Sequence, residues 1–228
     1  MPRILERRTK SIKNTDCERI KMLFGRFSGD YNKHMRTTNH VRVQLSILDD
    51  FLAWLKHNRQ GKLKALDIAT GTGTIAKRIM QKTNSEVHGI DYCPEMIKEA
   101  QKSHGINFSV GNVLKLPYKK HSFDVVTCSY GFYWFGNIER AINEIRKVLK
   151  PGGYFVLLEE EFKKGNPKPR FSKYKQPYLK ELANSENYIG IKMLKQKISK
   201  AGFKLIREIR MPVDTVHGTV GMMFRIQT

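Results

Sequence analysis

The chain has 228 residues, of which 40% are hydrophobic and 28% are charged. This balance is typical of a globular protein and leaves enough chain for one domain with a sizeable core. No apolar run approaches the roughly 20 residues of a membrane-spanning helix, and the basic N-terminus lacks the apolar segment of a signal peptide. We therefore expect a soluble, cytoplasmic protein.

The formal net charge is +21, with 42 lysines and arginines against 21 acidic residues. A charge of this size suits an anionic partner, such as RNA, an acidic carrier protein or a membrane surface. A lysine-rich proteome or a thermophilic surface would produce the same excess. Because the charge is spread along the chain without interleaved aromatic residues, it indicates which partners would adhere to the protein and not which substrate reacts.

The three cysteines, Cys17, Cys93 and Cys128, are odd in number and lack metal-ligand spacing. We interpret them as free thiols used for packing, and we expect no metal site.

The N-terminal quarter divides into an arm and a helical cap. Residues 1–14 are basic with little apolar content, which predicts a loose arm. Residues 15–58 carry two helical patterns. The face of the first consists of Ile20, Leu23, Phe24 and Phe27. The face of the second consists of Val41, Leu45, Leu48, Leu52 and Leu55.

Between residues 60 and 160, short apolar runs alternate with helical patterns. The expected strands are 63–68, 87–91, 106–110, 123–129 and 154–158. Helices are expected after the first strand, from Pro94 and over about 137–149, where Pro151-Gly152-Gly153 follows. A repeated strand–helix order predicts an α/β fold with a doubly wound, mostly parallel sheet.

Residues 161–190 break this order and read as an irregular insertion on the substrate side. The stretch 162–180 has three prolines, seven basic residues and no acidic residue. A last helix over 191–201 and strands over 203–211 and 217–226 complete a seven-stranded sheet. We therefore predict a single domain over residues 15–228.

The Gly-rich turn after the first strand marks the ligand site. Gly71-Thr72-Gly73 joins a buried strand to a helix. Turns of this kind, at the carboxyl ends of the strands, are where α/β sheets bind nucleotides. Gly71-x-Gly73-x-x-Ala76 also fits the dinucleotide fingerprint, with Asp91 as the following acid. Asp67, however, would place a carboxylate where a pyrophosphate must lie. A cationic ligand without phosphate, such as S-adenosylmethionine, suits the turn better.

Several motifs together resemble a class I S-adenosylmethionine-dependent methyltransferase over about residues 60–160. They are Leu66-Asp-Ile-Ala-Thr-Gly-Thr-Gly73, Gly89-Ile-Asp91, Gly111-Asn-Val-Leu-Lys-Leu-Pro117, Ser122-Phe-Asp-Val-Val126 and Val148-Leu-Lys-Pro-Gly-Gly153. The resemblance implies a Rossmann-like domain that transfers a methyl group from the sulfonium of S-adenosylmethionine.

Within that superfamily the chain has features of two groups. Ala69, where most members have glycine, and Asn112-Val113 resemble the C-methyltransferases of ubiquinone and menaquinone synthesis, although Phe132–Phe135 stands where those enzymes carry an Arg-Asn pair. The segment Phe24–Tyr31, with Tyr133-Trp134, resembles the malonyl-carrier-protein O-methyltransferases of biotin synthesis. The acceptor implied is a small or lipid-like molecule, methylated on oxygen or carbon.

The resemblance implies roles at the cofactor. Asp91 would bind both ribose hydroxyls, Asn112 the adenine N6 and the Val113 backbone N–H the adenine ring. Gly71, Thr72 and Gly73, with Ala69 in the same turn, would lie under the methionine and ribose. Asp67 would face the ammonium group or act only as a structural cap. Ser129 would meet the methionine end or only pack.

On the substrate side, Tyr31 is a candidate lid over the methionine carboxylate. Tyr133 and Trp134 belong to an aromatic run that would either wall an apolar substrate or fill the core. The candidates for a general base are Glu159, Glu160, His217 and Tyr133, and the sequence does not distinguish among them. The alternatives are transfer to RNA or to a carrier-bound substrate, and a non-catalytic cofactor-binding regulator.

Overall fold

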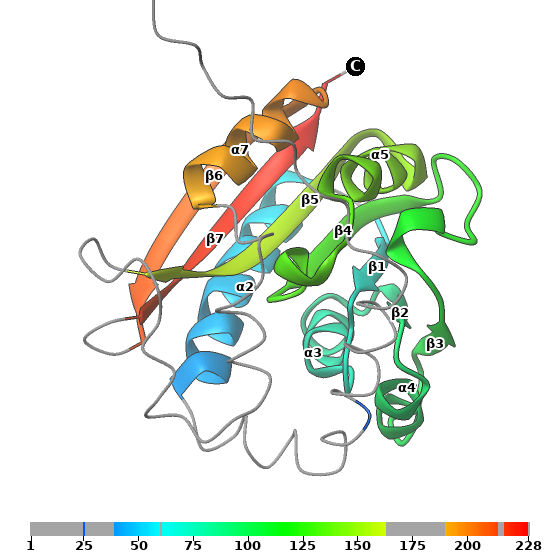
Figure 1. Ribbon diagram of the computed structural model, residues 1–228. Helices are drawn as coiled ribbons and strands as arrows, with labels where there is room; N and C mark the ends of the chain where they lie inside the picture. The colour runs from blue at the N-terminus through cyan, green and yellow to red at the C-terminus, as the bar shows by residue number, and fades with distance from the viewer. Residues whose placement is uncertain (1–24, 26–38, 60, 163–189, 214–216, 228) are drawn as a thin grey trace, which may run out of the picture.

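Seven strands form one sheet in the order β3-β2-β1-β4-β5-β7-β6, with helices on both faces (Figure 1). The computed structural model describes residues 25, 39–59, 61–162, 190–213 and 217–227. The strands are β1 Lys64–Ile68, β2 Glu86–Asp91, β3 Asn107–Val110, β4 Phe123–Ser129, β5 Leu149–Phe162, β6 Phe203–Pro212 and β7 His217–Ile226. The helices are α2 Asn39–Asn58, α3 Thr74–Thr83, α4 Pro94–Ala100, α5 Ile138–Val148 and α7 Ile191–Lys200, with short 3₁₀ helices η1 Val113–Lys115 and η2 Phe132–Trp134.

Strands β1 to β5 are parallel, and β7 runs antiparallel between β5 and β6. The order reverses at β1, whose neighbours are β2 and β4. In open α/β sheets this switch point forms a crevice at the carboxyl ends of the strands. The predicted doubly wound, mostly parallel seven-stranded sheet is confirmed.

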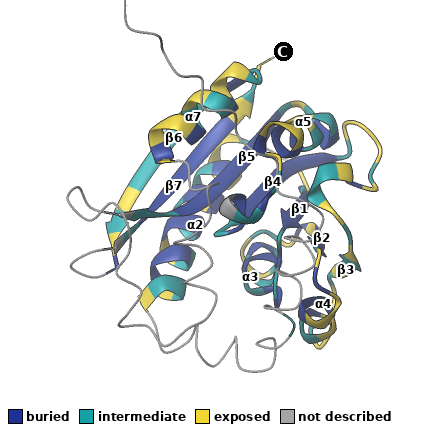
Figure 2. Cartoon of the chain, viewed as in Figure 1, coloured by how far each residue is buried: buried dark blue, intermediate teal, exposed yellow. Residues whose placement is uncertain are grey.

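Each sheet face has its own apolar core, because alternate strand residues point to opposite sides. Helices α2 and α3 pack on one face through Leu48, Phe51 and Ile79. Helices α5 and α7 pack on the other through Ile142, Ile145 and Leu194. Figure 2 shows the central strands buried and the outer helix faces exposed. No helix in the described part of the chain is long and apolar enough to cross a membrane.

Strand β5 is longer than predicted and begins at Leu149 instead of Tyr154. Leu149 pairs with Phe123 and Tyr154 with Val125, so the extra residues of β5 form a bulge between these pairs. Gly153 is needed there because a Cβ at this residue would lie 2.9 Å from the Lys150 carbonyl oxygen. The Pro-Gly-Gly sequence therefore bends a continuous strand, and α5 ends before it at Val148.

The apolar face of α2 is also wider than predicted. Leu48, Leu52 and Leu55 are buried as expected, whereas Val41 and Leu45 are only partly buried. The additional buried residues are Val43, Gln44, Ile47 and Phe51. The buried face of α2 is broad because this helix packs on β5, β7 and α3 together.

Several predictions lie outside the described residues. These are the arm 1–14, the helix around 20–27, Tyr31, Cys17 and most of the insertion 161–190. Cys93 and Cys128 are buried free thiols, as predicted.

Candidate functional site

The turn between β1 and α3 begins the candidate site. Ala69, Gly71 and Gly73 have φ values of 51°, 54° and 82°, in the left-handed region that glycine adopts without strain. The Gly73 amide donates to the Thr70 carbonyl at 2.9 Å. A Cβ on Gly73 would lie 2.7 Å from the Phe108 ring, whereas a Cβ on Gly71 would meet nothing within 4 Å. Gly71 is thus open toward a ligand, and Gly73 is required by internal packing.

Asp67 lies beneath this turn and is 1% exposed. Its Oδ2 accepts a hydrogen bond from the Thr70 hydroxyl and its Oδ1 one from the Thr127 hydroxyl, both at 2.6 Å. Burial raises the pKa of Asp67 to about 7, although the two hydroxyls oppose the shift. A nearby cation would favour the ionised carboxylate.

Asp91 closes the second side of the site at the end of β2. Its Oδ2 accepts from the Gly71 amide at 2.8 Å and its Oδ1 from the Cys93 amide at 2.9 Å. Burial raises the pKa of Asp91, and these backbone donors counteract the rise. Beyond its backbone donors, the carboxylate keeps acceptor capacity for a ligand hydroxyl. The sequence predicted the ligand role of Asp91 but not its hold on the glycine turn.

Asn112 and Val113 stand at the start of η1, beyond β3. The Asn112 Oδ1 accepts from the Leu114 amide at 2.8 Å and caps this short helix. One lone pair of that oxygen is therefore engaged within the chain, and the second remains for a donor on a ligand.

Ser129 ends β4 and carries an unusual hydroxyl. Its Oγ is buried and has no hydrogen-bond partner in the described part of the structure. Such a group costs about 1–3 kcal/mol unless something satisfies it. An orphan hydroxyl that faces a cavity is the signature expected of a ligand contact.

Two adjoining cavities connect these residues. The first is lined by predicted residues Ala69, Gly71, Asp91, Asn112, Val113, Ser129 and Trp134. The second, beside α2, is lined by predicted residues Asp67, Ala69, Gly71, Thr72 and Ser129. Gly73 lines neither cavity, because it lies behind the turn. The structure thus brings together every described cofactor residue that was predicted except Gly73.

The cavity walls also decide between the two ligand classes. The described lining residues include Asp67 and Asp91 and no lysine or arginine. A pyrophosphate would meet two carboxylates without a compensating cation, which disfavours a dinucleotide. The residues present fit an uncharged adenosine joined to a cationic group.

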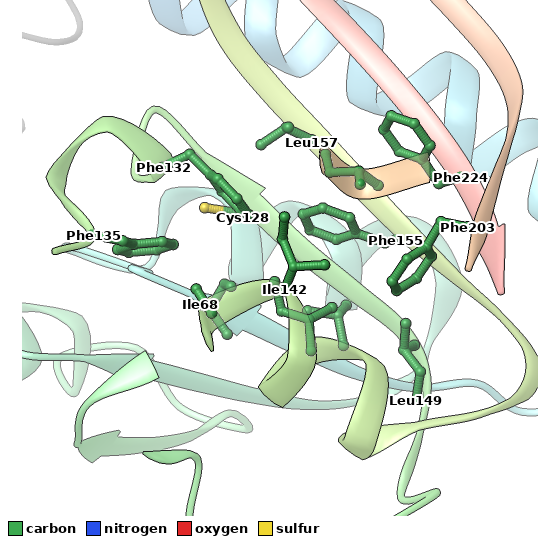
Figure 3. Close-up of a cluster of buried hydrophobic side chains, with 14 of the residues drawn as sticks. Ile68, Cys128, Phe132, Phe135, Ile142, Leu149, Phe155, Leu157, Phe203 and Phe224 are labelled. Atoms are coloured by element: carbon green, nitrogen blue, oxygen red, sulfur yellow. The ribbon is translucent and has the colours of Figure 1, made fainter. Parts of the chain in front are cut away.

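The aromatic run after β4 divides between the core and the cavity. Phe132 and Phe135 are 0% and 8% exposed and pack with Cys128 and Ile68 in the core, as Figure 3 shows. Trp134 and Phe135 line the first cavity. The side chain of Tyr133 lies outside the described residues. Phe132 and Phe135 therefore pack in the core, as one interpretation predicted, and a substrate wall at Trp134 stays a prediction.

Sequence reasoning missed Gln44, Tyr92 and Tyr130. Tyr92 follows Asp91 and lines the first cavity, Gln44 lines the second, and Tyr130 lines both. Tyr92 and Tyr130 directly follow strand-end residues that were predicted, so the same strand-end rule could have found them. Gln44 is 4% exposed, and a buried polar residue on a helix face is itself a signal.

Comparisons with known proteins agree with this geometry. Residues 66–157 match the model of a methyltransferase domain family. The chain is 40% identical over 102 residues to a demethylmenaquinone methyltransferase of Deinococcus radiodurans, covering 42% of each chain. It is 31% identical over 163 residues to the ubiquinone/menaquinone biosynthesis C-methyltransferase UbiE of Bartonella tribocorum, covering 68% of this chain and 58% of that one.

This chain therefore spans about half the length of these two relatives. A phosphoethanolamine N-methyltransferase from Haemonchus contortus, solved with phosphomonomethylethanolamine and S-adenosylhomocysteine, has the same fold. It superposes with a TM-score of 0.63 at 17% identity and covers 78% of this chain and 52% of its own. These findings confirm the predicted resemblance and fold of the methyltransferase domain.

Proposed function

We propose that this chain is an S-adenosylmethionine-dependent methyltransferase that acts on a small, lipid-like acceptor of the demethylated quinone class. The observation that carries the proposal is the cavity at the switch point, with two carboxylates, no basic lining residue in the described part and the orphan Ser129 hydroxyl. The relatives' printed names supply the acceptor class. They do not favour RNA, a carrier-bound substrate or a regulator.

Named residues would hold the cofactor. Asp91 binds the ribose hydroxyls while it fixes the turn at Gly71, which lies with Thr72 along the ribose and methionine. Asn112 and the Val113 amide contact adenine. Asp67 faces the ammonium group, with Ala69 beside it. Ser129 donates its hydroxyl to the methionine end. Gly73 shapes the turn from behind, and Tyr31 is the proposed lid.

S-adenosylmethionine supplies a methyl group on a positively charged sulfur, which is already electrophilic. The protein's main task is then to align the acceptor with that methyl group and to exclude water. Trp134, with Tyr133 beside it in sequence, is the proposed wall of the acceptor site. A flat, apolar ring system suits a cavity bounded by Trp134 and Phe135.

The deciding experiment is a calorimetric titration of the full chain with S-adenosylmethionine and S-adenosylhomocysteine, with NADH as the control. We expect micromolar binding of the first two and none of NADH. Incubation with S-adenosylmethionine and dithionite-reduced demethylmenaquinone should then yield S-adenosylhomocysteine and a methylated product in equal amounts. Tight NADH binding would refute the cofactor, whereas cofactor binding without turnover would refute the acceptor class.

Asp91→Ala tests the geometry of the cofactor site. Charged hydrogen bonds contribute about 1.5–3 kcal/mol each, so we expect affinity for S-adenosylmethionine to fall about 10- to 150-fold. Asp50→Ala is the matched control, because Asp50 forms a surface ion pair with Arg207 at 2.7 Å, away from the cavity. An Asp91→Ala variant with unchanged affinity contradicts the assignment.

We further propose that the +21 charge draws the protein to an anionic membrane surface that holds its acceptor. This partner follows from the lipid-like acceptor class, because a lipid substrate resides in a bilayer.

A further inference from the structure

The segment that leaves β4 is held at two points by the end of β5. The Tyr130 amide donates to the Leu158 carbonyl at 2.9 Å, and the Phe132 amide donates to the Glu159 Oε1, also at 2.9 Å. Two consecutive residues of β5 thus fix alternate amides of this segment, the first through its backbone and the second through its side chain. Only the second contact depends on which amino acid β5 carries.

The segment held in this way forms part of the cavity walls. Tyr130 lines both cavities, and Trp134 lines the first. Within η2, the Trp134 amide donates to the Gly131 carbonyl at 3.0 Å and the Phe135 amide to the Phe132 carbonyl at 3.2 Å. These bonds make residues 131–135 one connected turn, so a group that holds Phe132 also holds Trp134 in place.

Glu159 itself lies away from solvent and from any ligand. It is 0% exposed, and it is not among the described residues that line either cavity. Leu157, two residues earlier on the same face of β5, packs in the core cluster that contains Phe132 (Figure 3). Val220 of the same cluster pairs in register with Glu159. The carboxyl group thus lies in an apolar core and can influence a ligand only through the chain that it holds.

A carboxyl group in this core is costly. Burial raises the pKa of Glu159 to about 8, and its Oε2 has no partner among the described residues. An apolar side chain of similar size would avoid that cost. It could not, however, accept the hydrogen bond of the Phe132 amide. A buried group that costs stability and makes one specific contact is expected where that contact serves function.

We propose that Glu159 is a positioning residue that holds the start of η2, and with it Trp134, at the place where the acceptor binds. The inference rests on the proposed function, in which Trp134 forms the wall of the acceptor site. Glu159 touches neither the acceptor nor the cofactor. Its loss should therefore displace the wall and weaken acceptor binding, while the hydrogen bond between Asp91 and the Gly71 amide remains in place.

Glu159→Leu and Glu159→Gln form the test pair. Leucine cannot accept the Phe132 amide, whereas glutamine keeps an oxygen for it. In the acceptor assay described above, we expect Glu159→Leu to raise the KM for the acceptor about 5-fold, the effect of one neutral hydrogen bond, and to change kcat less. Glu159→Gln should keep the wild-type KM. Affinity for S-adenosylhomocysteine should be unchanged in both variants.

Glu161→Leu is the matched control. Glu161 is the next carboxyl residue on the same face of β5, and it is partly exposed and forms an ion pair with Arg210 at 2.9 Å. It lines neither cavity. We expect wild-type values of KM, kcat and S-adenosylhomocysteine affinity in this variant.

The fluorescence of Trp134 reports the position of η2 without any turnover. The chain has two tryptophans, so Trp54→Phe leaves Trp134 as the only one. Trp54 meets the Tyr154 ring edge to face, and phenylalanine keeps an aromatic ring at that contact. In this background, we expect Glu159→Leu to shift the Trp134 emission and to increase its quenching by acrylamide. Glu159→Gln should change neither.

Urea unfolding separates positioning from a purely structural role. At pH 7 the unfolding midpoint of Glu159→Leu should equal or exceed that of the wild-type protein, because a buried carboxyl group has been removed. A purely structural role predicts the opposite, a lower midpoint together with weaker S-adenosylhomocysteine binding. That result would overturn the proposal.

The remaining outcomes distinguish the two proposals. Unchanged Trp134 fluorescence in Glu159→Leu would overturn the role of Glu159, and so would altered fluorescence with an unchanged acceptor KM. Equal defects in Glu159→Gln and Glu159→Leu would overturn it as well. If the wild-type protein binds S-adenosylmethionine but does not methylate the acceptor, the proposed acceptor class falls. The role of Glu159 then stands if Trp134 fluorescence changes in Glu159→Leu alone, and otherwise falls too.

Discussion

At the residue scale, the site is built around polar groups that are costly to bury. Asp67 and Asp91 are carboxylates with raised pKa values, and the Ser129 hydroxyl has no partner in the described structure. Natural proteins accept such costs chiefly where function requires them. The same three residues lie at or next to the carboxyl ends of their strands, which is why the sequence could point to them.

Ser129→Ala should therefore separate stability from binding. Removing a buried, unpartnered hydroxyl should leave the free energy of unfolding unchanged or raise it by up to about 1 kcal/mol. Affinity for S-adenosylmethionine should fall about 3- to 10-fold, as for one neutral hydrogen bond. Thermal unfolding and calorimetry measure the two effects. Ser122→Ala is the control, because the Ser122 hydroxyl donates to the Lys119 carbonyl in a turn away from the cavity.

Glu159 is a second carboxyl whose burial has a measurable consequence. It is 0% exposed, its Oε1 accepts from the Phe132 amide at 2.9 Å, and its Oε2 has no partner among the described residues. Burial raises the pKa of Glu159 to about 8. Because the folded protein prefers the neutral form, the stabilisation is complete below the unfolded pKa of about 4.5 and is lost as pH rises through about 8.

We expect the free energy of unfolding to fall between pH 5 and pH 8, with a contribution from Glu159 that approaches about 1.4 kcal/mol per pH unit. Asp67, with its raised pKa, contributes a fall of the same sign up to about pH 7. Glu159→Gln should remove its share of the slope, because the amide keeps the bond to Phe132 and does not titrate. Urea unfolding at several pH values measures the slope. An identical slope in Glu159→Gln and in the partly exposed control Glu161→Gln would contradict the account.

At the scale of elements, the docking of α2 on the sheet places one wall of the second cavity. Gly221 on β7 lies at that contact. A Cβ there would lie 2.2 Å from the Ile47 Cγ2 and 2.9 Å from the Phe51 ring. Only glycine lets the helix approach this closely, so the fit of α2 depends on a single missing side chain.

Gly221→Ala should lower the free energy of unfolding by about 1–3 kcal/mol, because the overpacked helix must move. It should also weaken S-adenosylhomocysteine binding, since Val41 and Gln44 of α2 line the cavity. Gly190→Ala is the control, because a Cβ on Gly190 would meet nothing within 4 Å. Chemical denaturation of both variants decides the matter, and equal stabilities would show that α2 adapts freely.

At the scale of the whole molecule, the charge of +21 is the one bulk property that fold and site do not explain. If it serves a membrane surface, the protein should float with phosphatidylglycerol vesicles and not with phosphatidylcholine vesicles. The screening length falls from about 10 Å at 0.1 M salt to about 3 Å at 1 M, so the binding should disappear over that range. Equal binding to both kinds of vesicle would contradict a membrane partner. So would loss of binding to phosphatidylglycerol vesicles when tRNA is added at constant salt.

The alternation of strands and helices, the glycine turn and the acids at Asp67 and Asp91 could all be predicted from the amino-acid sequence. These are local signals, because burial imposes periodicity and a tight turn requires glycine within a few residues. Strand β4 has the predicted bounds Phe123–Ser129 for this reason. The resemblance to a known family added the doubly wound, mostly parallel seven-stranded sheet, whereas the strand order came from the structure.

The face that each residue presents and the partners that it contacts could not be predicted before the sheet and its helices were placed. No local pattern relates His40 to Glu160, which is 120 residues away, or Tyr130 to Thr219, which is 89 residues away. The same holds for the partnerless Ser129 hydroxyl, since a missing partner is a property of the whole surrounding shell. Burial, pKa shifts and side-chain pairing depend on contacts between distant strands and helices, and those contacts exist only once the sheet and its helices have assembled.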